Sequence, residues 1–356
     1  MSVHIETLIH RLRTGISTAE LVHVPHDRWP LSRASVQSTR QESRALKIAV
    51  LDSSFNPPTL AHRALASVSL SQPPYNVTHA PPDLGLPSAS VASGPSSGFD
   101  ARLLLLSVRN ADKALKPGDA TYTQRLQMMT LLAQDIMVEW ERAQLANSEG
   151  PDGKDNVAVA IIDEPTFVGK SRILHRFFQS RLSYVRALHR DAEKTESAPI
   201  VNNREESFAS SSATYAPHPQ MSFVVGIDTL ERILSPRYYS SEDAMRDSLR
   251  QFLSSDGDSS HLVCARRIMP GQLQSPNERE EEMWRIVYKY IDSGSVTMVD
   301  IGEKIQEFSS SEVRERIRIA ADDMLWKSMV TDSVAEFIER EGLYLDLDAT
   351  ISGASR

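Results

Sequence analysis

Short apolar runs alternate with amphipathic stretches along much of this chain. The runs at residues 47–51, 103–108, 157–162, 221–225, 262–265 and 296–299 have the length and composition of buried β-strands. Residues 59–70 and 123–144 show the three- and four-residue spacing of amphipathic helices. Buried strands that alternate with helices form parallel sheets covered on both faces. The pattern therefore predicts an α/β fold, with a doubly wound parallel sheet, helices on both faces and a C-terminal helical segment.

Polar segments divide the chain around these elements. Residues 1–46 are expected to form an N-terminal extension that packs on the surface of the core. Residues 71–98 are rich in Pro, Ser, Ala and Gly, and residues 192–219 are a second stretch of this kind, so both are predicted to be flexible insertions. The prediction is one domain over residues 47–345, followed by a tail at 346–356.

The junction between the first strand and the first core helix is a candidate anion site. Residues 53–58 form a small, polar, proline-containing turn, the helix begins at Thr59, and His62 lies one turn into it. Backbone amides at such a junction, with the positive end of a helix dipole behind them, bind phosphate. A single histidine near a helix start is also common as a structural residue, so the junction needs support from elsewhere in the chain.

This segment resembles the nucleotidyltransferase superfamily, and within it the nicotinamide mononucleotide adenylyltransferases. The signature is Gly-Ser/Thr-Phe-Asn/Asp-Pro followed by His/Thr-x-x-His, and here residues 53–57 and 59–62 match it. The resemblance implies a Rossmann-like sheet on which Ser53, Ser54, Phe55 and Thr59 bind the nucleotide. It also implies that His62 is catalytic, as a hydrogen-bond donor to the α-phosphate. Ser53 stands where the family usually has Gly, and Thr59 replaces the first histidine of the commoner motif.

A second match lies near the C-terminus. Residues 308–314, Phe-Ser-Ser-Ser-Glu-Val-Arg, are similar to the family's Ile-Ser-Ser-Thr-x-Ile-Arg, which grips the triphosphate. The resemblance implies that Ser309, Ser310 and Ser311 bind the nucleotide and that Arg314 is catalytic. The spacing also fits a capping box in which Ser309 caps a helix and Glu312 reaches back, so an ordinary helix start is the alternative.

Two weaker likenesses follow the same order. Residues 221–230 resemble the family's strand ending in Gly-Ala-Asp-x-Leu, which implies nucleotide binding by Gly226 and Asp228; alternatively, Asp228 caps the next helix. Residues 334–344 are similar to the C-terminal tail of the bacterial nicotinate and nicotinamide mononucleotide enzymes. At the level of motif order the resemblance covers residues 46–70 and 100–345. The Ser-rich insertions indicate a divergent, fungal-like member.

The acceptor side has two candidate residues. Lys113 follows the second strand in a segment loosely similar to one in which the family has a lysine near the acceptor phosphate. Trp140 has a ring suited to stacking on nicotinamide, but its position in an apolar stripe favours core packing over that role. The motifs contain no paired carboxylates at ligand spacing, so Mg²⁺ is expected to arrive bound to ATP.

Composition narrows the class of protein. With 47 acidic and 39 basic residues the net charge is −8, which disfavours nucleic-acid binding. There is no apolar run of membrane-spanning length and no start typical of a secretory signal, so a soluble protein is expected. The single cysteine, Cys264, excludes an internal disulfide and favours a reducing compartment, the cytosol or nucleus.

The expected reaction joins the AMP part of ATP to nicotinamide mononucleotide, giving NAD and pyrophosphate. One alternative is transfer of AMP or CMP to another phosphate acceptor, such as phosphopantetheine or a phosphoalcohol. A second is a non-catalytic or ATP-hydrolysing regulatory protein that retained the nucleotide site. Neither oligomeric state nor the choice between nicotinamide and nicotinate mononucleotide follows from the pattern.

Overall fold

The computed structural model describes most of the predicted core. The described residues are 2–32, 45–68, 98–109, 116–147, 156–196, 218–265, 286–291, 293–302, 305, 307–319 and 324–345. Lys113, the predicted tail at 346–356 and most of both predicted insertions lie outside these ranges.

The described strands form one seven-stranded sheet in the order β1-β4-β3-β2-β5-β6-β7. Their bounds are Ala19–His23 (β1), Leu46–Asp52 (β2), Ala101–Ser107 (β3), Val157–Ile162 (β4), Pro219–Gly226 (β5), His261–Ala265 (β6) and Val296–Val299 (β7). Strands β2 to β7 are parallel, whereas β1 pairs antiparallel with β4. The strand order reverses at β2, which lies between β3 and β5, and ligands bind at the carboxyl ends of strands beside such a point.

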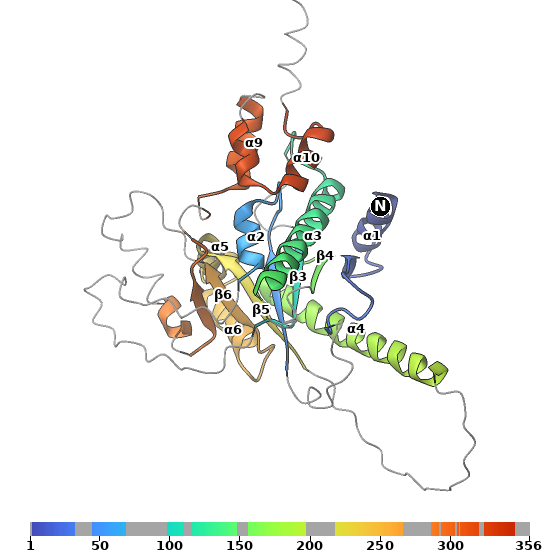
Figure 1. Cartoon of the computed structure of the whole chain (residues 1–356). Helices are drawn as coiled ribbons and strands as arrows, with labels where there is room; N and C mark the ends of the chain where they lie inside the picture. Colours follow the sequence, from blue (N-terminus) through green and yellow to red (C-terminus); the bar gives the residue numbers. More distant parts are fainter. Residues whose placement is uncertain are drawn as a thin grey trace, which may run out of the picture.

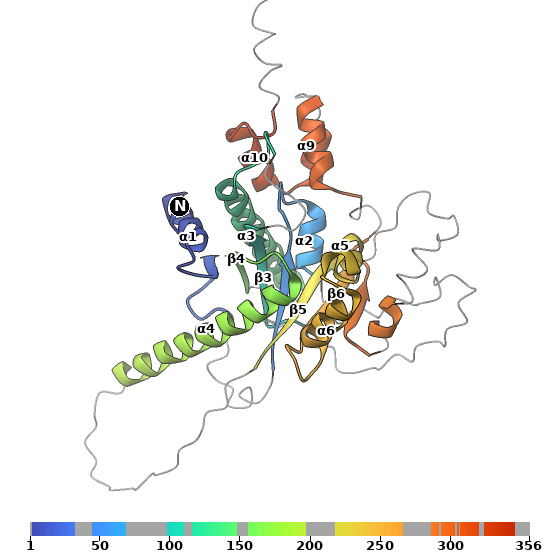
Figure 2. The ribbon, with the colours of Figure 1, turned by 180° about the vertical axis from the view of Figure 1, so that it is seen from behind.

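Helices cover both faces of the sheet, which confirms the predicted doubly wound α/β fold (Figures 1 and 2). Helices α1 (Ser2–Arg13), α2 (Leu60–Ala66) and α3 (Tyr122–Asn147) cover one face, and α4 (Phe167–Glu196), α5 (Ile227–Ile233) and α6 (Glu242–Leu253) cover the other. Side chains of β3 alternate between the two layers: Leu103 and Leu105 pack toward α4 and α6, and Leu104 and Leu106 toward α3.

The C-terminal helices form a third apolar cluster above the carboxyl end of the sheet, as predicted (Figure 1). They are α9 (Ser310–Ile319), η6 (Met324–Met329) and α10 (Asp332–Arg340), while a short η5 (Pro236–Tyr238) precedes α6. Val313, Trp326 and Phe337 pack in this cluster together with Met128 of α3. The last helices are therefore fixed beside the start of α3, close to the turn after β2.

Several details differ from the sequence-based expectation, and three of them change the picture of the fold. Helix α2 ends at Ala66 rather than at residue 70, because the Ser67 N–H bonds to the carbonyl oxygens of Arg63 and Ala64 in a tight last turn. Helix α4 continues to Glu196, into the predicted insertion. The N-terminal extension is also more than a surface layer, since β1 is the edge strand of the sheet.

Among the described helices, none is both long and apolar enough to span a membrane.

Candidate functional site

His62 is held by two groups from its own strand-to-helix junction. The Thr59 backbone N–H donates to His62 Nδ1 at 3.0 Å, and the Thr59 Oγ1 lies 2.9 Å from the same nitrogen. On the other side of the ring, Nε2 lies 2.9 Å from Ser53 Oγ. Thr59 is fully buried as the N-cap of α2, so its described contacts orient His62.

These contacts define the protonation state of the imidazole. An amide N–H can only donate, so Nδ1 accepts, and the neutral ring carries its proton on Nε2. Burial lowers the pKa of His62 to about 4, which keeps the ring neutral near pH 7. His62 therefore presents an Nε2–H donor toward the turn after β2, where Ser53 Oγ accepts it.

Phe55 gives this turn its shape. Its backbone lies in the left-handed region, with φ of 44°, which is uncommon for a bulky residue. The side chain is completely buried, and its ring centroid lies 5.0 Å from that of His62. Core packing thus holds an unfavourable backbone conformation in place beside the histidine. The predicted nucleotide contact of Phe55 is restricted to its backbone, because the ring belongs to the core.

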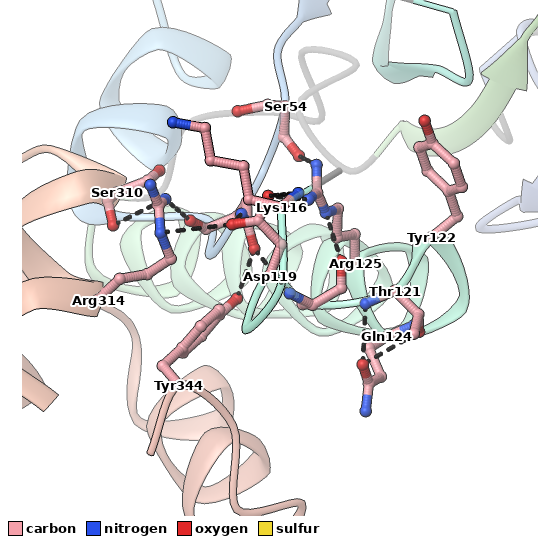
Figure 3. Close-up of polar contacts among 12 residues, drawn as sticks. Ser54, Lys116, Asp119, Thr121, Tyr122, Gln124, Arg125, Ser310, Arg314 and Tyr344 are labelled. Atoms are coloured by element: carbon pink, nitrogen blue, oxygen red, sulfur yellow. Dashed lines mark hydrogen bonds and ion pairs between the residues drawn. The ribbon is translucent and has the colours of Figure 1, made fainter. Parts of the chain in front are cut away.

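Asn56 links the turn to two distant parts of the chain through Asp119 and Tyr344, both of which are labelled in Figure 3. Its amide nitrogen donates to Asp119 Oδ1 at 2.8 Å. Its amide oxygen accepts from the Ala120 N–H at 3.2 Å and from the Tyr344 hydroxyl at 2.9 Å. Burial raises the pKa of Tyr344, so this hydroxyl is a neutral donor. The Asn56 side chain therefore holds the turn against α3 and the C-terminal segment, with two bonds to its amide oxygen and one from its amide nitrogen.

The Asp119 carboxylate lies close to the guanidinium groups of Arg125 and Arg314. Arg125 donates to the Ala120 and Ser54 carbonyl oxygens at 2.8 and 3.4 Å, and its Nη2 lies 3.5 Å from Asp119 Oδ2. Burial alone would raise the pKa of Asp119. Hydrogen bonds from a backbone N–H and from the Asn56 amide, together with the charges of Arg125 and Arg314, outweigh burial, so this pKa is lowered.

Arg314 reaches the same network from α9. Its Nη1 donates to the Asn56 carbonyl oxygen at 2.5 Å and to the Ser310 carbonyl oxygen at 3.2 Å, and its Nε lies 3.7 Å from Asp119 Oδ1. The side chain remains 30% exposed, so part of the guanidinium faces solvent. The structure thus brings Arg314 to the turn that carries His62, although the two residues are far apart in the sequence.

The start of α9 docks on the turn through its serines. Ser309 Oγ accepts from the Glu312 N–H at 3.1 Å, as expected for a cap. Glu312 does not reach back to complete the capping box, because its carboxylate binds Arg316 instead. The Ser310 hydroxyl donates to the Pro57 carbonyl at 2.7 Å, and Ser311, which is exposed, accepts from Arg314 at 3.3 Å.

Gly226 and Asp228 lie at the adjacent end of β5. Gly226 is the N-cap of α5 and has an ordinary φ of −84°, so no left-handed backbone requires glycine here. A Cβ at this position would meet no described atom within 4 Å, so the backbone borders open space. Asp228, in the first turn of α5, makes no hydrogen bond or ion pair with other described residues. Both residues are available to a ligand at this edge.

Of the two acceptor-side candidates, the structure describes Trp140 alone. Lys113 lies outside the described residues. The stacking role predicted for Trp140 is corrected by its position: its ring lies 4.9 Å from the Arg102 guanidinium, and Arg102 is at the first pairs of β3, the amino edge of the sheet. Helix α3 runs away from the carboxyl edge, so its C-terminal half carries Trp140 to the opposite side.

Several residues of the site had no signal of their own in the sequence. Asn56 and Tyr344 belong to motifs but were not singled out, whereas Asp119, Arg125 and the ion pair of Asp52 with Lys170 matched no motif. The bonds of Asn56 with Asp119, of Asp52 with Lys170 and of Tyr344 with Asn56 join residues 63, 118 and 288 positions apart, so only the folded structure brings these residues together. The described residues contain no group of three or more His, Cys, Asp or Glu arranged to hold a metal ion.

The chain aligns with two solved structures of nicotinic acid mononucleotide adenylyltransferase from Plasmodium falciparum. The one complexed with APC aligns with a TM-score of 0.40 and 12% identity over 84% of this chain and 96% of that chain. The one complexed with NaAD aligns with a TM-score of 0.41 and 14% identity over 84% and 97%. No protein-family model and no curated protein sequence matches the chain. A likeness at this level does not identify a family.

Proposed function

We propose that this protein is a nucleotidyltransferase that moves AMP from MgATP to a phosphate-bearing acceptor, with nicotinamide mononucleotide as the first candidate. The observation that carries the proposal is the neutral Nε2–H of His62, held at the carboxyl edge beside the point where the strand order reverses. Arg314 and the start of α9 lie against the same turn, in the order expected from the two motifs.

The reaction needs positioning and charge stabilisation more than proton transfer. An oxygen of the acceptor phosphate forms a bond to the α-phosphorus, and the bond from that phosphorus to the oxygen bridging to the β-phosphate breaks. The electron pair leaves with pyrophosphate. Because the attacking oxygen is already anionic, no general base is required, and donors aimed at the α-phosphate lower the barrier.

The residues divide this work between them. His62 donates its Nε2–H to an α-phosphate oxygen, which takes the place that Ser53 Oγ occupies in the structure. Arg314, 30% exposed and already at the turn, binds the outer phosphates, with amides at the start of α9 adding partial positive charge. Asp228 accepts hydrogen bonds from the ribose. Magnesium enters as part of MgATP, since Asp52 and Asp119 are both paired with cations.

The test is a transfer assay on the full chain. The protein is incubated with MgATP and a panel of acceptors, namely nicotinamide mononucleotide, nicotinate mononucleotide, phosphopantetheine and a phosphoalcohol, and products are separated by chromatography. We expect dinucleotide and pyrophosphate in equal amounts, and turnover of His62→Ala reduced about 10²–10³-fold. His175→Ala is the matched control, because His175 is also half-buried with a lowered pKa but binds the Asp258 carbonyl oxygen. Full activity of His62→Ala would refute the mechanism.

One observation favours a second reading, nucleotide binding or ATP hydrolysis without transfer. The Ser53 hydroxyl, at a position where the resembled family has glycine, already occupies the His62 donor. Ser53→Gly separates the readings. Transfer that rises in this variant indicates a working site restrained by the serine, whereas ATP binding without dinucleotide, in wild type and variant alike, supports the second reading.

A further inference from the structure

A buried ion pair joins Asp52, the residue before Ser53 at the end of β2, to Lys170. Lys170 Nζ lies 2.5 Å from Asp52 Oδ2, and the two side chains are only 5% and 11% exposed. Asp52 is the last residue of β2, whereas Lys170 comes from the first turn of α4, 118 residues later in the chain. The pair therefore ties the strand that leads into the turn to a helix on the other side of the sheet.

Fold stability alone gives little reason for this pair. A cation in the first turn of a helix faces the positive end of the helix dipole. Removing both charges from water also costs free energy, and apolar replacements of buried pairs are often as stable as the pairs themselves. An apolar contact at residues 52 and 170 would hold the two elements together without these costs.

The start of α4 provides a rigid support for Lys170. The Glu164 carboxylate accepts from the Thr166 N–H at 2.9 Å and from its hydroxyl at 2.6 Å. The Thr166 Oγ1 in turn accepts from the Gly169 N–H at 3.1 Å. A Cβ on Gly169 would lie 2.3 Å from Glu164 Cδ, so the Glu164 side chain lies directly over Gly169 and would have to move for a larger residue. The ammonium group is thus presented from a fixed helix start.

Asp52, the other residue of the pair, is followed directly by Ser53 of the candidate site. Successive side chains along a strand point to opposite faces, so the orientation of Asp52 determines where Ser53 points. The Ser53 N–H donates to the Leu105 carbonyl oxygen at 3.3 Å, and Ser53 Oγ lies 2.9 Å from His62 Nε2. Holding Asp52 therefore holds Ser53, and with it the surroundings of the His62 donor.

We propose that Asp52 and Lys170 are positioning residues for the turn at residues 53–55: their buried pair locks the end of β2, so that the His62 donor faces the reacting phosphate. This inference rests on the proposed function for its catalytic consequence. Its structural part, the control of the surroundings of His62, can be measured independently.

The experiment compares the wild type with Lys170→Met and with the double variant Asp52→Asn/Lys170→Met, which leaves no buried charge unpaired. The His62 C2–H resonance, assigned with His62→Gln, is titrated by NMR, and transfer kinetics and melting temperature are recorded on the same samples. Lys327→Met, which removes the Lys327–Glu339 pair on the C-terminal helices, is the matched control.

We expect the wild-type His62 to titrate near its lowered pKa of about 4. In both pair variants this value should rise by about one pH unit or more, as water enters a loosened turn. The kcat for transfer should fall about tenfold or more while the KM for ATP stays within about twofold, because binding groups are retained. Lys327→Met should match the wild type in all three.

Two outcomes would overturn the inference. One is a double variant in which His62 titrates as in the wild type. The other is a change in melting temperature alone, with kcat unaltered, which would make the pair merely structural. If Lys170→Met fails to fold, the double variant decides. If the wild type transfers AMP to none of the acceptors, the proposed function fails, while the His62 titration still tests the pair.

Discussion

Two arginines are buried at opposite edges of the sheet, and they are accommodated differently. Arg125, near the carboxyl edge, donates to two carbonyl oxygens and lies beside Asp119. Arg102, near the amino edge, donates to the Val68 carbonyl oxygen at 3.2 Å and lies against the rings of Phe99 and Trp140. Its Nε and Nη1 have no hydrogen-bond partner among the residues that the structure describes.

The pKa values reflect the same difference. Burial lowers the pKa of both guanidinium groups, to about 10 for Arg102. At Arg125 the Asp119 carboxylate opposes that effect, whereas at Arg102 burial acts without an opposing carboxylate. The fold can therefore bury an arginine with one hydrogen bond and two aromatic contacts. The dense hydrogen bonding at the carboxyl edge is a property of that edge, and it surrounds the residues of the proposed site.

Removing the carboxylate at the carboxyl edge should have the largest effect. We expect Asp119→Ala to lower the free energy of unfolding by about 3 kcal/mol, because Arg125 stays buried without its counter-charge. Urea denaturation of the full chain measures this. Asp119→Asn, which keeps an acceptor, is the control and should lose less. A loss in Asp119→Ala below about 1 kcal/mol would mean that the carbonyl oxygens alone suffice for Arg125.

At the amino edge, Trp140→Ala should lower stability without affecting chemistry. The half-buried ring packs on Arg102, so we expect a loss of about 2 kcal/mol, at the lower end for a large core side chain. The KM for any acceptor found in the transfer assay should be unchanged. A clear rise in that KM would restore the stacking role predicted from the sequence and would weaken the contrast between the two edges.

Tyr344→Phe removes one hydrogen bond, the bond from the Tyr344 hydroxyl to the Asn56 amide oxygen. The free energy of unfolding should fall by about 1 kcal/mol, because Asn56 Oδ1 still accepts from the Ala120 N–H after the hydroxyl is removed. Urea denaturation again measures it. If the loss equals that of Asp119→Ala, the network acts as one unit rather than as separate bonds, and a double mutant cycle of the two would show the coupling.

A further effect is confined to acid pH. Burial lowers the folded pKa of His62 from 6.5 to about 4, so the unfolded chain binds more protons between these values. The stability from the neutral ring is thus fully present above pH 6.5 and is lost as the pH falls toward 4. The melting temperature of His62→Gln should fall less than that of the wild type over this window. If the melting temperatures of the two proteins fell in parallel with pH, this would contradict the burial of His62.

The sequence predicted the sheet well because its information is local. Runs such as residues 157–162 and 296–299 coincide with β4 and β7, since buried strands require continuous apolar residues. Strand β1 was missed because its sequence, Ala-Glu-Leu-Val-His, is short and only half-buried at an edge. Trp140 was ambiguous because an apolar stripe identifies the face of a helix but not which edge of the sheet a position along it reaches.

In the candidate site, too, the local contacts follow from the sequence and the long-range contacts do not. The contacts of His62 with Thr59 and Ser53 follow from spacings of three and nine residues, which a motif records. The pairing of Asn56 with Asp119 spans 63 residues and depends on how α3 packs against the turn. No local pattern encodes that distance, so the carboxylate that balances Arg125 and Arg314 emerged only from the fold.

The bond between Tyr344 and Asn56 also sets an order of events during synthesis. The two residues are 288 positions apart. At about 5–20 residues per second, a ribosome adds that stretch in roughly 15–60 s. Throughout this interval the nascent chain contains Asn56 but not yet its partner Tyr344. We therefore expect the site to mature late, after the sheet, and factors that bind nascent chains to meet it with the Asn56 amide still unpaired on that side.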